Sequence, residues 1–186
     1  MPATNSDFFK RTVLAAEIID QLKDENTLGH LKLQKLMYLC QHTTRMNLQT
    51  NFLKQAMGPY NPRLMRSIDK QMKIKNWFEF AKDKFPKYQP LENAGEHTQW
   101  YNRYFTHQKS QIDSIINIFR TAKSHQVELV ATIYACCLES KKNKEIISKV
   151  TIVNKVYAWS KDKEKFSEQQ ITSAHTWMQE KGIYPT

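Results

Sequence analysis

Residues 31–41 read LKLQKLMYLCQ, and residues 58–62 read GPYNP. In the first stretch, four apolar side chains recur with helical spacing i, i+3, i+4 and i+7, namely Leu33, Leu36, Met37 and Cys40. This spacing places them on one stripe of an amphipathic helix. We therefore expect the intervening Lys32, Gln34 and Lys35 to face solvent or a partner.

The second stretch predicts a boundary between two elements. Residues 51–57 have weak helical character, and the Gly-Pro pair at 58–59 is expected to end that element. Asn61 is a favourable N-cap, and Pro62 suits the first helical position, where its missing N–H costs nothing. A second, basic helix is therefore predicted over 62–75.

Helical periodicity extends over most of the remaining chain. The expected helices cover residues 6–24, with Ser6 as cap and Gly29 as the stop, then 97–120, 126–140, 144–159, and a last helix capped by Ser167. For the apolar residues 126–140, a strand is the less favoured alternative. Residues 76–92 lack this period and predict at most one small β hairpin. The predicted fold is mainly α, a compact single domain over residues 1–186 of about seven helices, with a sub-domain boundary allowed near 121–126.

The charge of the chain is strongly and unevenly basic. Its 186 residues carry 28 Lys and Arg against 18 Asp and Glu, a net charge of +10. Residues 61–87 alone hold eight of these cations against three acids. Such a surplus indicates an acidic protein partner or nucleic acid. The candidate contact residues are Arg63, Arg66, Lys70, Lys73 and Lys75, together with Lys32 and Lys35.

Several classes of chemistry lack their sequence signals. The four glycines form no phosphate-binding loop, and the six histidines and three cysteines show no zinc spacing. We therefore expect no cofactor and no metal, and we interpret the cysteines as buried free thiols. No apolar run reaches membrane-span length, and the N-terminus lacks a signal-peptide pattern, so a cytoplasmic location is expected.

Two alternative functions, a nuclease and a DNA-binding regulator, each require particular residues. A nuclease would need clustered acids before a lysine, and only Glu139 and Lys141 offer an E-x-K triplet, without an upstream acidic strand. A DNA-binding regulator could use the basic helix 62–75 or the C-terminal hairpin. The last helix carries Glu168 and Glu180 with Lys181 as its one cation, which suits DNA poorly.

The order of these motifs resembles the Panacea (SocA-like) domain. That family has a K-L-Q-K-L-[LM]-Y-[LF]-[AC] helix, matched here by residues 32–40, and a G-P motif some twenty residues later, matched by Gly58 and Pro59. The resemblance implies an antitoxin or adaptor module that recognises partner proteins and is not itself an enzyme.

A second resemblance covers most of residues 12–185. It is to a helical module appended to type I restriction-modification proteins, notably their specificity subunits. The matching pieces include LGHLKLQK, ELVATIYA and a W-x-x-x-K-x-x-F motif at Trp159, Lys163 and Phe166. The DNA-reading domains of those subunits, and any methyltransferase or helicase motif, have no counterpart here, so only the accessory module carries over.

The sequence therefore predicts a non-catalytic, defence-associated interaction module, either antitoxin-like or accessory to restriction-modification. Its expected partner is a toxin or a restriction-modification subunit, bound through the basic helix, with nucleic acid as the alternative. The structural centre is expected to comprise Leu33, Gln34, Leu36, Tyr38, Gly58, Pro59 and Tyr60.

Overall fold

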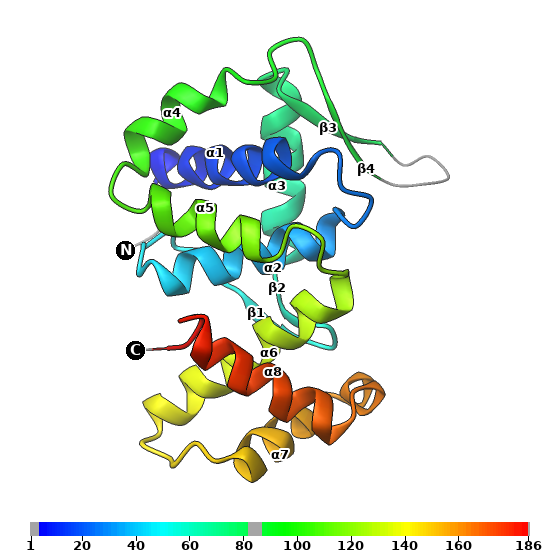
Figure 1. Ribbon diagram of the computed structural model, residues 1–186. Helices are drawn as coiled ribbons and strands as arrows, with labels where there is room; N and C mark the ends of the chain where they lie inside the picture. Colours follow the sequence, from blue (N-terminus) through cyan, green and yellow to red (C-terminus); the bar gives the residue numbers. More distant parts are fainter. Residues whose placement is uncertain (1–3, 82–86, 186) are drawn as a thin grey trace.

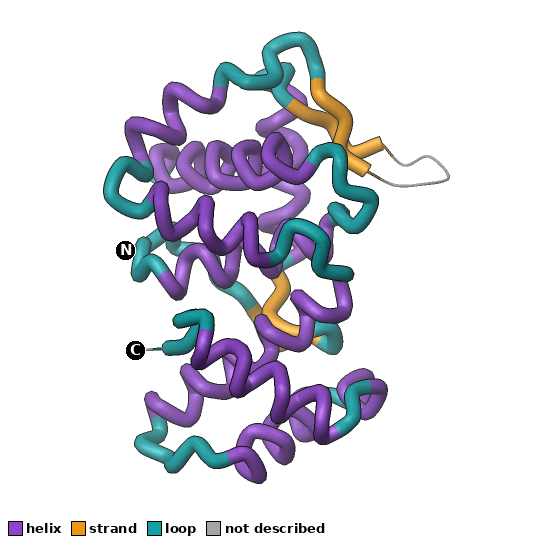
Figure 2. Tube along the Cα trace, in the orientation of Figure 1, coloured by secondary structure: helices purple, strands orange, loops and turns teal. Residues whose placement is uncertain are grey.

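A computed structural model describes residues 4–81 and 87–185, and Lys82, Asp83 and Lys84 of the basic segment lie outside these ranges. The described chain is mainly α-helical, as predicted, with two small antiparallel hairpins (Figures 1 and 2). Its elements are α1 (Asn5–Leu22), α2 (His30–Thr43), β1 (Leu53–Gln55), β2 (Gly58–Tyr60), α3 (Pro62–Ile74), β3 (Phe78–Ala81), β4 (Lys87–Pro90), α4 (His97–Tyr104), α5 (Lys109–Ile118), α6 (Ser124–Lys142), α7 (Lys149–Trp159), the 3₁₀ helix η1 (Lys161–Lys165) and α8 (Glu168–Glu180).

Helix α2, built from the LKLQKLMYL stretch, lies at the centre of the molecule. Leu33, Leu36, Met37 and Cys40 are buried, which confirms the predicted apolar stripe. Burial extends around the helix, because α1, α5, α6 and β2 all pack against it. Tyr38 is also buried, with its ring 5.1 Å from that of Phe52. An isolated amphipathic pattern therefore underestimates how completely this helix is enclosed.

The two ends of α1 differ from the prediction. Thr4, rather than Ser6, caps α1, and its side chain accepts a hydrogen bond from the Asp7 amide in a capping box. The helix ends at Leu22, and Gly29 is the N-cap of α2 instead of the stop of α1. Both corrections are shifts of a helix end, where local signals compete.

The expected helix over 51–57 is wrong, because this segment forms the hairpin β1–β2. Leu53 pairs with Tyr60 and Gln55 with Gly58. The indole Nε1 of Trp159 donates to the Gln55 carbonyl at 2.7 Å, and the Ser160 hydroxyl donates to the Ala56 carbonyl at 2.8 Å. These carbonyls are thus bound by a segment about a hundred residues away. The weak helix propensity of residues 51–57 does not outweigh these long-range contacts.

The single helix expected over 97–120 is divided into α4 and α5. The break follows Tyr104, where the Thr106 hydroxyl donates to the Asn102 carbonyl at 2.6 Å. A threonine side chain that takes a backbone acceptor competes with helix continuation. The small hairpin predicted within 76–92 is present as β3–β4, and Phe78 pairs with Pro90.

The helices form two groups around α2 and β1–β2. Figure 1 shows α1, α3, α4, α5 and the hairpin β3–β4 on one side, and α7 and α8 on the other. Helix α6 joins the groups, because it packs against α2 and β2 as well as α7 and α8. It begins at Ser124, inside the interval where the sequence allowed a boundary. As predicted, Ser167 caps α8.

Candidate interaction surface

Helix α3 presents a row of four exposed cations, which we call the basic face: Arg63, Arg66, Lys70 and Lys73. They recur at i, i+3, i+7 and i+10, so they lie within about 80° of one another and span about 15 Å along the helix. Lys75, the C-cap, is exposed as well and lies 5.5 Å from the centre of the Phe9 ring. All five of these candidate contact residues are therefore exposed.

The opposite side of α3 fixes the helix to the fold. Leu64, Met65, Ile68 and Met72 are buried there, with α1 and β3 as neighbours. The one acid of the helix, Asp69, accepts a hydrogen bond from the Tyr88 hydroxyl at 2.9 Å and lies 2.9 Å from His30 Nε2. Asp69 thus contacts these two neighbours and forms no salt bridge with a cation of the basic face.

The start of α3 is tied directly to α2. Asn61 caps the helix, and its side chain accepts from the Leu64 amide at 3.1 Å. The Gln34 carboxamide donates to the Asn61 carbonyl at 3.0 Å and accepts from the Asn61 amide at 2.5 Å. Gln34 therefore sets where the basic helix begins, which gives the glutamine of the KLQK motif a structural role.

The surroundings of the basic face are partly apolar. Ile74 is 62% exposed and Phe8 is 42% exposed. Phe8 and Arg63 line the same shallow depression at the start of α3. Ile74 follows Arg63 by eleven residues, about three turns, so it lies on the same side of the helix. The sequence reasoning missed both side chains, although this spacing was a signal for Ile74.

Ion pairing leaves most of the basic face free. Lys73 pairs with Glu79 at 3.0 Å, and both side chains are exposed. Arg63, Arg66 and Lys70 form no salt bridge with any residue of 4–81 or 87–185. Three cations within about two turns are thus available to an external anion.

Lys32, Gln34 and Lys35 are all fully buried, so the expectation that they face solvent or a partner is wrong. The Lys32 ammonium donates to the Thr27 hydroxyl and to the carbonyls of Arg120 and Ala122, at 2.7–2.8 Å. The Lys35 ammonium donates to the Pro59 carbonyl at 2.6 Å. These acceptors come from elsewhere in the chain and turn both lysines inward.

Burial changes the proton affinity of both side chains. It lowers the pKa of Lys32 to about 8 and that of Lys35 to about 7. For Lys35, the nearby Lys163 lowers the pKa further, while Glu128 opposes the shift. Within the folded chain these lysines brace the α2 region, and their side chains do not reach a surface.

The Gly58-Pro59-Tyr60 segment lies against α2 and α6. Gly58 has φ of 90°, and a Cβ added there would lie 2.7 Å from Thr132 Oγ1. Glycine is therefore required for both the backbone conformation and the close contact. The Lys35 ammonium lies 5.4 Å from the centre of the Tyr60 ring. The predicted structural role of this segment agrees with these contacts.

A buried ion pair joins α6 to η1, and the sequence reasoning did not identify it. Glu128 and Lys163 are both fully buried and form a salt bridge, and Lys165 binds the other Glu128 oxygen at 3.1 Å. Burial is the largest influence on Lys163 and lowers its pKa, whereas Glu128 opposes this shift. Glu128 begins the ELVATIYA motif, and Lys163 lies in the W-x-x-x-K-x-x-F motif. The presence of both motifs in one chain was the sequence signal that could have indicated this ion pair.

Glu139 and Lys141, the candidate nuclease residues, contact different parts of the chain. Glu139 faces Lys155, with 3.9 Å between the charged atoms, while the Lys141 ammonium donates to the Pro185 carbonyl at 3.3 Å. In the described part of the chain, no three His, Cys, Asp or Glu side chains are grouped as metal ligands. In the C-terminal hairpin, the exposed side of α8 includes Glu168, Gln169 and Glu180.

The burial of the cysteines and the character of the helices bear on thiol reactivity and on membrane insertion. Cys40, Cys136 and Cys137 are free and buried, as predicted. Burial raises the pKa of Cys136 to about 12 and that of Cys137 to about 11, which disfavours the nucleophilic thiolate. Across residues 4–81 and 87–185, no helix combines the length and apolarity needed to cross a bilayer.

Comparison with known proteins returned no family: no protein-family profile matches the chain, and no curated protein sequence matches it significantly.

Proposed function

We propose that this chain is a non-catalytic interaction module that binds an acidic protein partner through the basic face of α3. The observation that carries the proposal is the exposure of Arg63, Arg66 and Lys70 without salt bridges in the described chain. Complementary charge accelerates association and selects the partner. The Asn61 cap and the buried side of α3 fix the position of the helix that carries these cations.

The apolar side chains beside the cations favour a protein over nucleic acid. Phe8 and Ile74 expose apolar surface near the two ends of the basic face. Protein interfaces combine an apolar centre with charged surroundings. Phosphate contacts, in contrast, use cations and hydrogen-bond donors and give these two side chains no role. An acidic surface with apolar side chains of its own therefore fits this region best.

The resemblance to the Panacea domain and to the restriction-modification module supports two biological settings within the proposal. In the first, the module is antitoxin-like and its partner is a toxin in the cytoplasm. In the second, it is an accessory of a restriction-modification complex and binds one of its subunits. Adjacent genes distinguish them, since a toxin gene favours the first and methylase and specificity genes favour the second.

The proposal is tested by affinity capture from the native host, with and without nuclease, at low and moderate salt. The variant Arg63→Glu/Arg66→Glu/Lys70→Glu is compared with Lys142→Glu/Lys144→Glu/Lys149→Glu, which reverses three exposed lysines elsewhere. We expect a protein that survives nuclease and is lost only with the α3 variant. Recovery of nucleic acid alone, lost as salt rises, would support direct nucleic-acid binding instead.

A further inference from the structure

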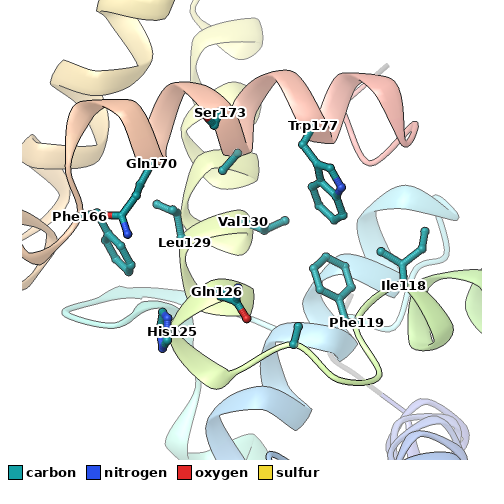
Figure 3. A pocket seen from close by; sticks show the side chains of 12 residues that line it. Ile118, Phe119, His125, Gln126, Leu129, Val130, Phe166, Gln170, Ser173 and Trp177 are labelled. Atoms are coloured by element: carbon teal, nitrogen blue, oxygen red, sulfur yellow. The ribbon is translucent and has the colours of Figure 1, made fainter.

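A groove of about 510 Å³ lies on a different part of the molecule from the basic face. It runs between one side of α8 and the segment that joins α5 to α6 (Figure 3). Pockets for small molecules typically measure about 300–1,000 Å³ and are lined mainly by apolar and aromatic side chains with a few polar groups. The groove has this size and this kind of lining.

The two ends of the groove differ in chemistry. Trp177 and Phe119 form one end, with ring centres 5.7 Å apart in an edge-to-face arrangement, and Val130 lies between the ends (Figure 3). His125 and Gln170 lie at the other end, beside Phe166. An apolar body thus fits the Trp177 end, and a polar group fits the other.

Two carboxamides on the groove wall are fixed by helix capping. Gln126 Oε1 accepts from the Lys123 amide at 2.8 Å, and Gln170 Oε1 accepts from the Ser167 amide at 2.8 Å. In each case the oxygen is occupied, so the NH₂ group remains as the free donor. Neither NH₂ group is hydrogen-bonded to another described residue. The groove therefore offers two donors whose orientation is set by the backbone.

The exposed charge of Lys123 favours an anion near this end. Lys123 is exposed directly before the wall residues of α6, and the Lys165 ammonium lies 5.1 Å from the centre of the Phe166 ring. Lys165 is itself in salt bridges with Glu128 and Asp162, whereas Lys123 forms no salt bridge with a described residue. The two free NH₂ donors and the exposed Lys123 suit a carboxylate, whose two oxygens only accept hydrogen bonds.

We propose that this groove binds a small amphipathic carboxylate. Its flat or branched apolar body lies against Phe119, Val130 and Trp177, and its carboxylate meets the NH₂ groups of Gln126 and Gln170. This inference goes beyond the proposed function and is independent of it, because the basic face takes no part in the groove. It adds a ligand site to a module otherwise defined by its protein partner.

The test measures binding of 1-naphthaleneacetate and of its uncharged analogue 1-naphthaleneacetamide by calorimetry. We expect saturable binding of the carboxylate and about tenfold weaker binding of the amide, since charged hydrogen bonds are the stronger kind. Changes in the methyl spectra of Leu129 and Val130 locate the bound probe in the groove. Absence of saturable binding up to about 5 mM for naphthaleneacetate, indole-3-acetate and decanoate would overturn the proposal.

Charge variants test the carboxylate without disturbing the helix caps. Glutamate serves a capping box as well as glutamine does, so Gln126→Glu and Gln170→Glu keep the fold while replacing each donor by an anionic oxygen. Each variant should weaken 1-naphthaleneacetate binding by about tenfold. The control Gln179→Glu adds the same charge to the opposite side of α8, nine residues from Gln170, and should leave binding unchanged.

A steric variant tests the location. Ser173 is an exposed residue of the groove wall, so Ser173→Phe should fill the groove and abolish binding while the chain stays folded. Binding that persists in this variant, or that responds equally to Gln170→Glu and Gln179→Glu, would contradict the proposed site.

Discussion

Three buried lysines and the cations of α3 carry the same charge but lie in opposite environments. Lys32, Lys35 and Lys163 are fully buried, and each binds carbonyl, hydroxyl or carboxylate oxygens of distant segments. Arg63, Arg66 and Lys70 are exposed and lie outside such internal networks. The difference teaches that an acceptor within reach, and not the residue type, decides whether a cation supports the fold or remains available to a partner.

The largest effect is expected at the buried ion pair. Glu128→Leu would leave Lys163 buried without its closest counter-ion, which should lower the free energy of unfolding by about 3–5 kcal/mol. Urea denaturation measures this loss. The double variant Glu128→Leu/Lys163→Met should recover most of the stability, because no charge then remains unpaired. A loss below about 1 kcal/mol in the single variant would show that the pair does not support the fold.

The next effect concerns the glycine that lets β2 approach α6. Gly58→Ala combines a positive φ with a Cβ 2.7 Å from Thr132 Oγ1, so it should cost about 3 kcal/mol of unfolding free energy. The matched control is Gly95→Ala, which has φ of 100° but nothing within 4 Å of the added Cβ. It should cost about 1 kcal/mol. Equal losses would mean that the close packing at Gly58 is unimportant.

The buried lysines should also give stability a dependence on pH. Lys35 has a pKa near 7 when folded, below its ordinary 10.5, so its charged form destabilises the fold. The penalty is complete below pH 7 and disappears as pH rises towards 10.5, so stability should increase from pH 7 to 9. The slope for this one group is at most about 1.4 kcal/mol per pH unit.

Urea denaturation at pH 7, 8 and 9 measures this slope. Lys35→Met removes the titrating group, so the variant should show a flatter profile than the wild type over the same interval. Lys32, whose pKa is near 8, contributes a similar slope above pH 8 and remains in both proteins. An unchanged slope in Lys35→Met would contradict the assignment to Lys35.

The smallest effect on stability is expected at the basic face. Arg63→Glu/Arg66→Glu/Lys70→Glu changes exposed side chains without salt bridges in the described chain, so unfolding free energy should shift by no more than about 0.5 kcal/mol. Thermal and urea denaturation measure the shift. A loss of several kcal/mol would mean that these cations, like the buried lysines, stabilise the fold.

Sequence patterns predicted the features that depend on near neighbours. The start of α3 at Asn61 and Pro62, the cap of α8 at Ser167 and the exposure of Arg63 and Arg66 all follow from spacing within one helix. Local rules suffice there because the interacting groups lie within a few residues.

Features that depend on distant partners could not be predicted in this way. Lys32 is turned inward by carbonyls 88 and 90 residues away, and the hairpin β1–β2 is held by Trp159, 104 residues from Gln55. Glu128 and Lys163 are separated by 35 residues. The groove between α8, α6 and the segment that joins α5 to α6 likewise exists only after these elements pack, so no single segment indicates it.

The central claim is that the α3 cations serve recognition and not folding. Its most direct test is the affinity of the captured and purified partner for the wild type and for Arg63→Glu/Arg66→Glu/Lys70→Glu, measured by calorimetry on proteins of known unfolding free energy. We predict at least about a hundredfold loss of affinity, because reversed charges repel an acidic surface, with unchanged stability. Unchanged affinity in the stable variant would contradict the claim.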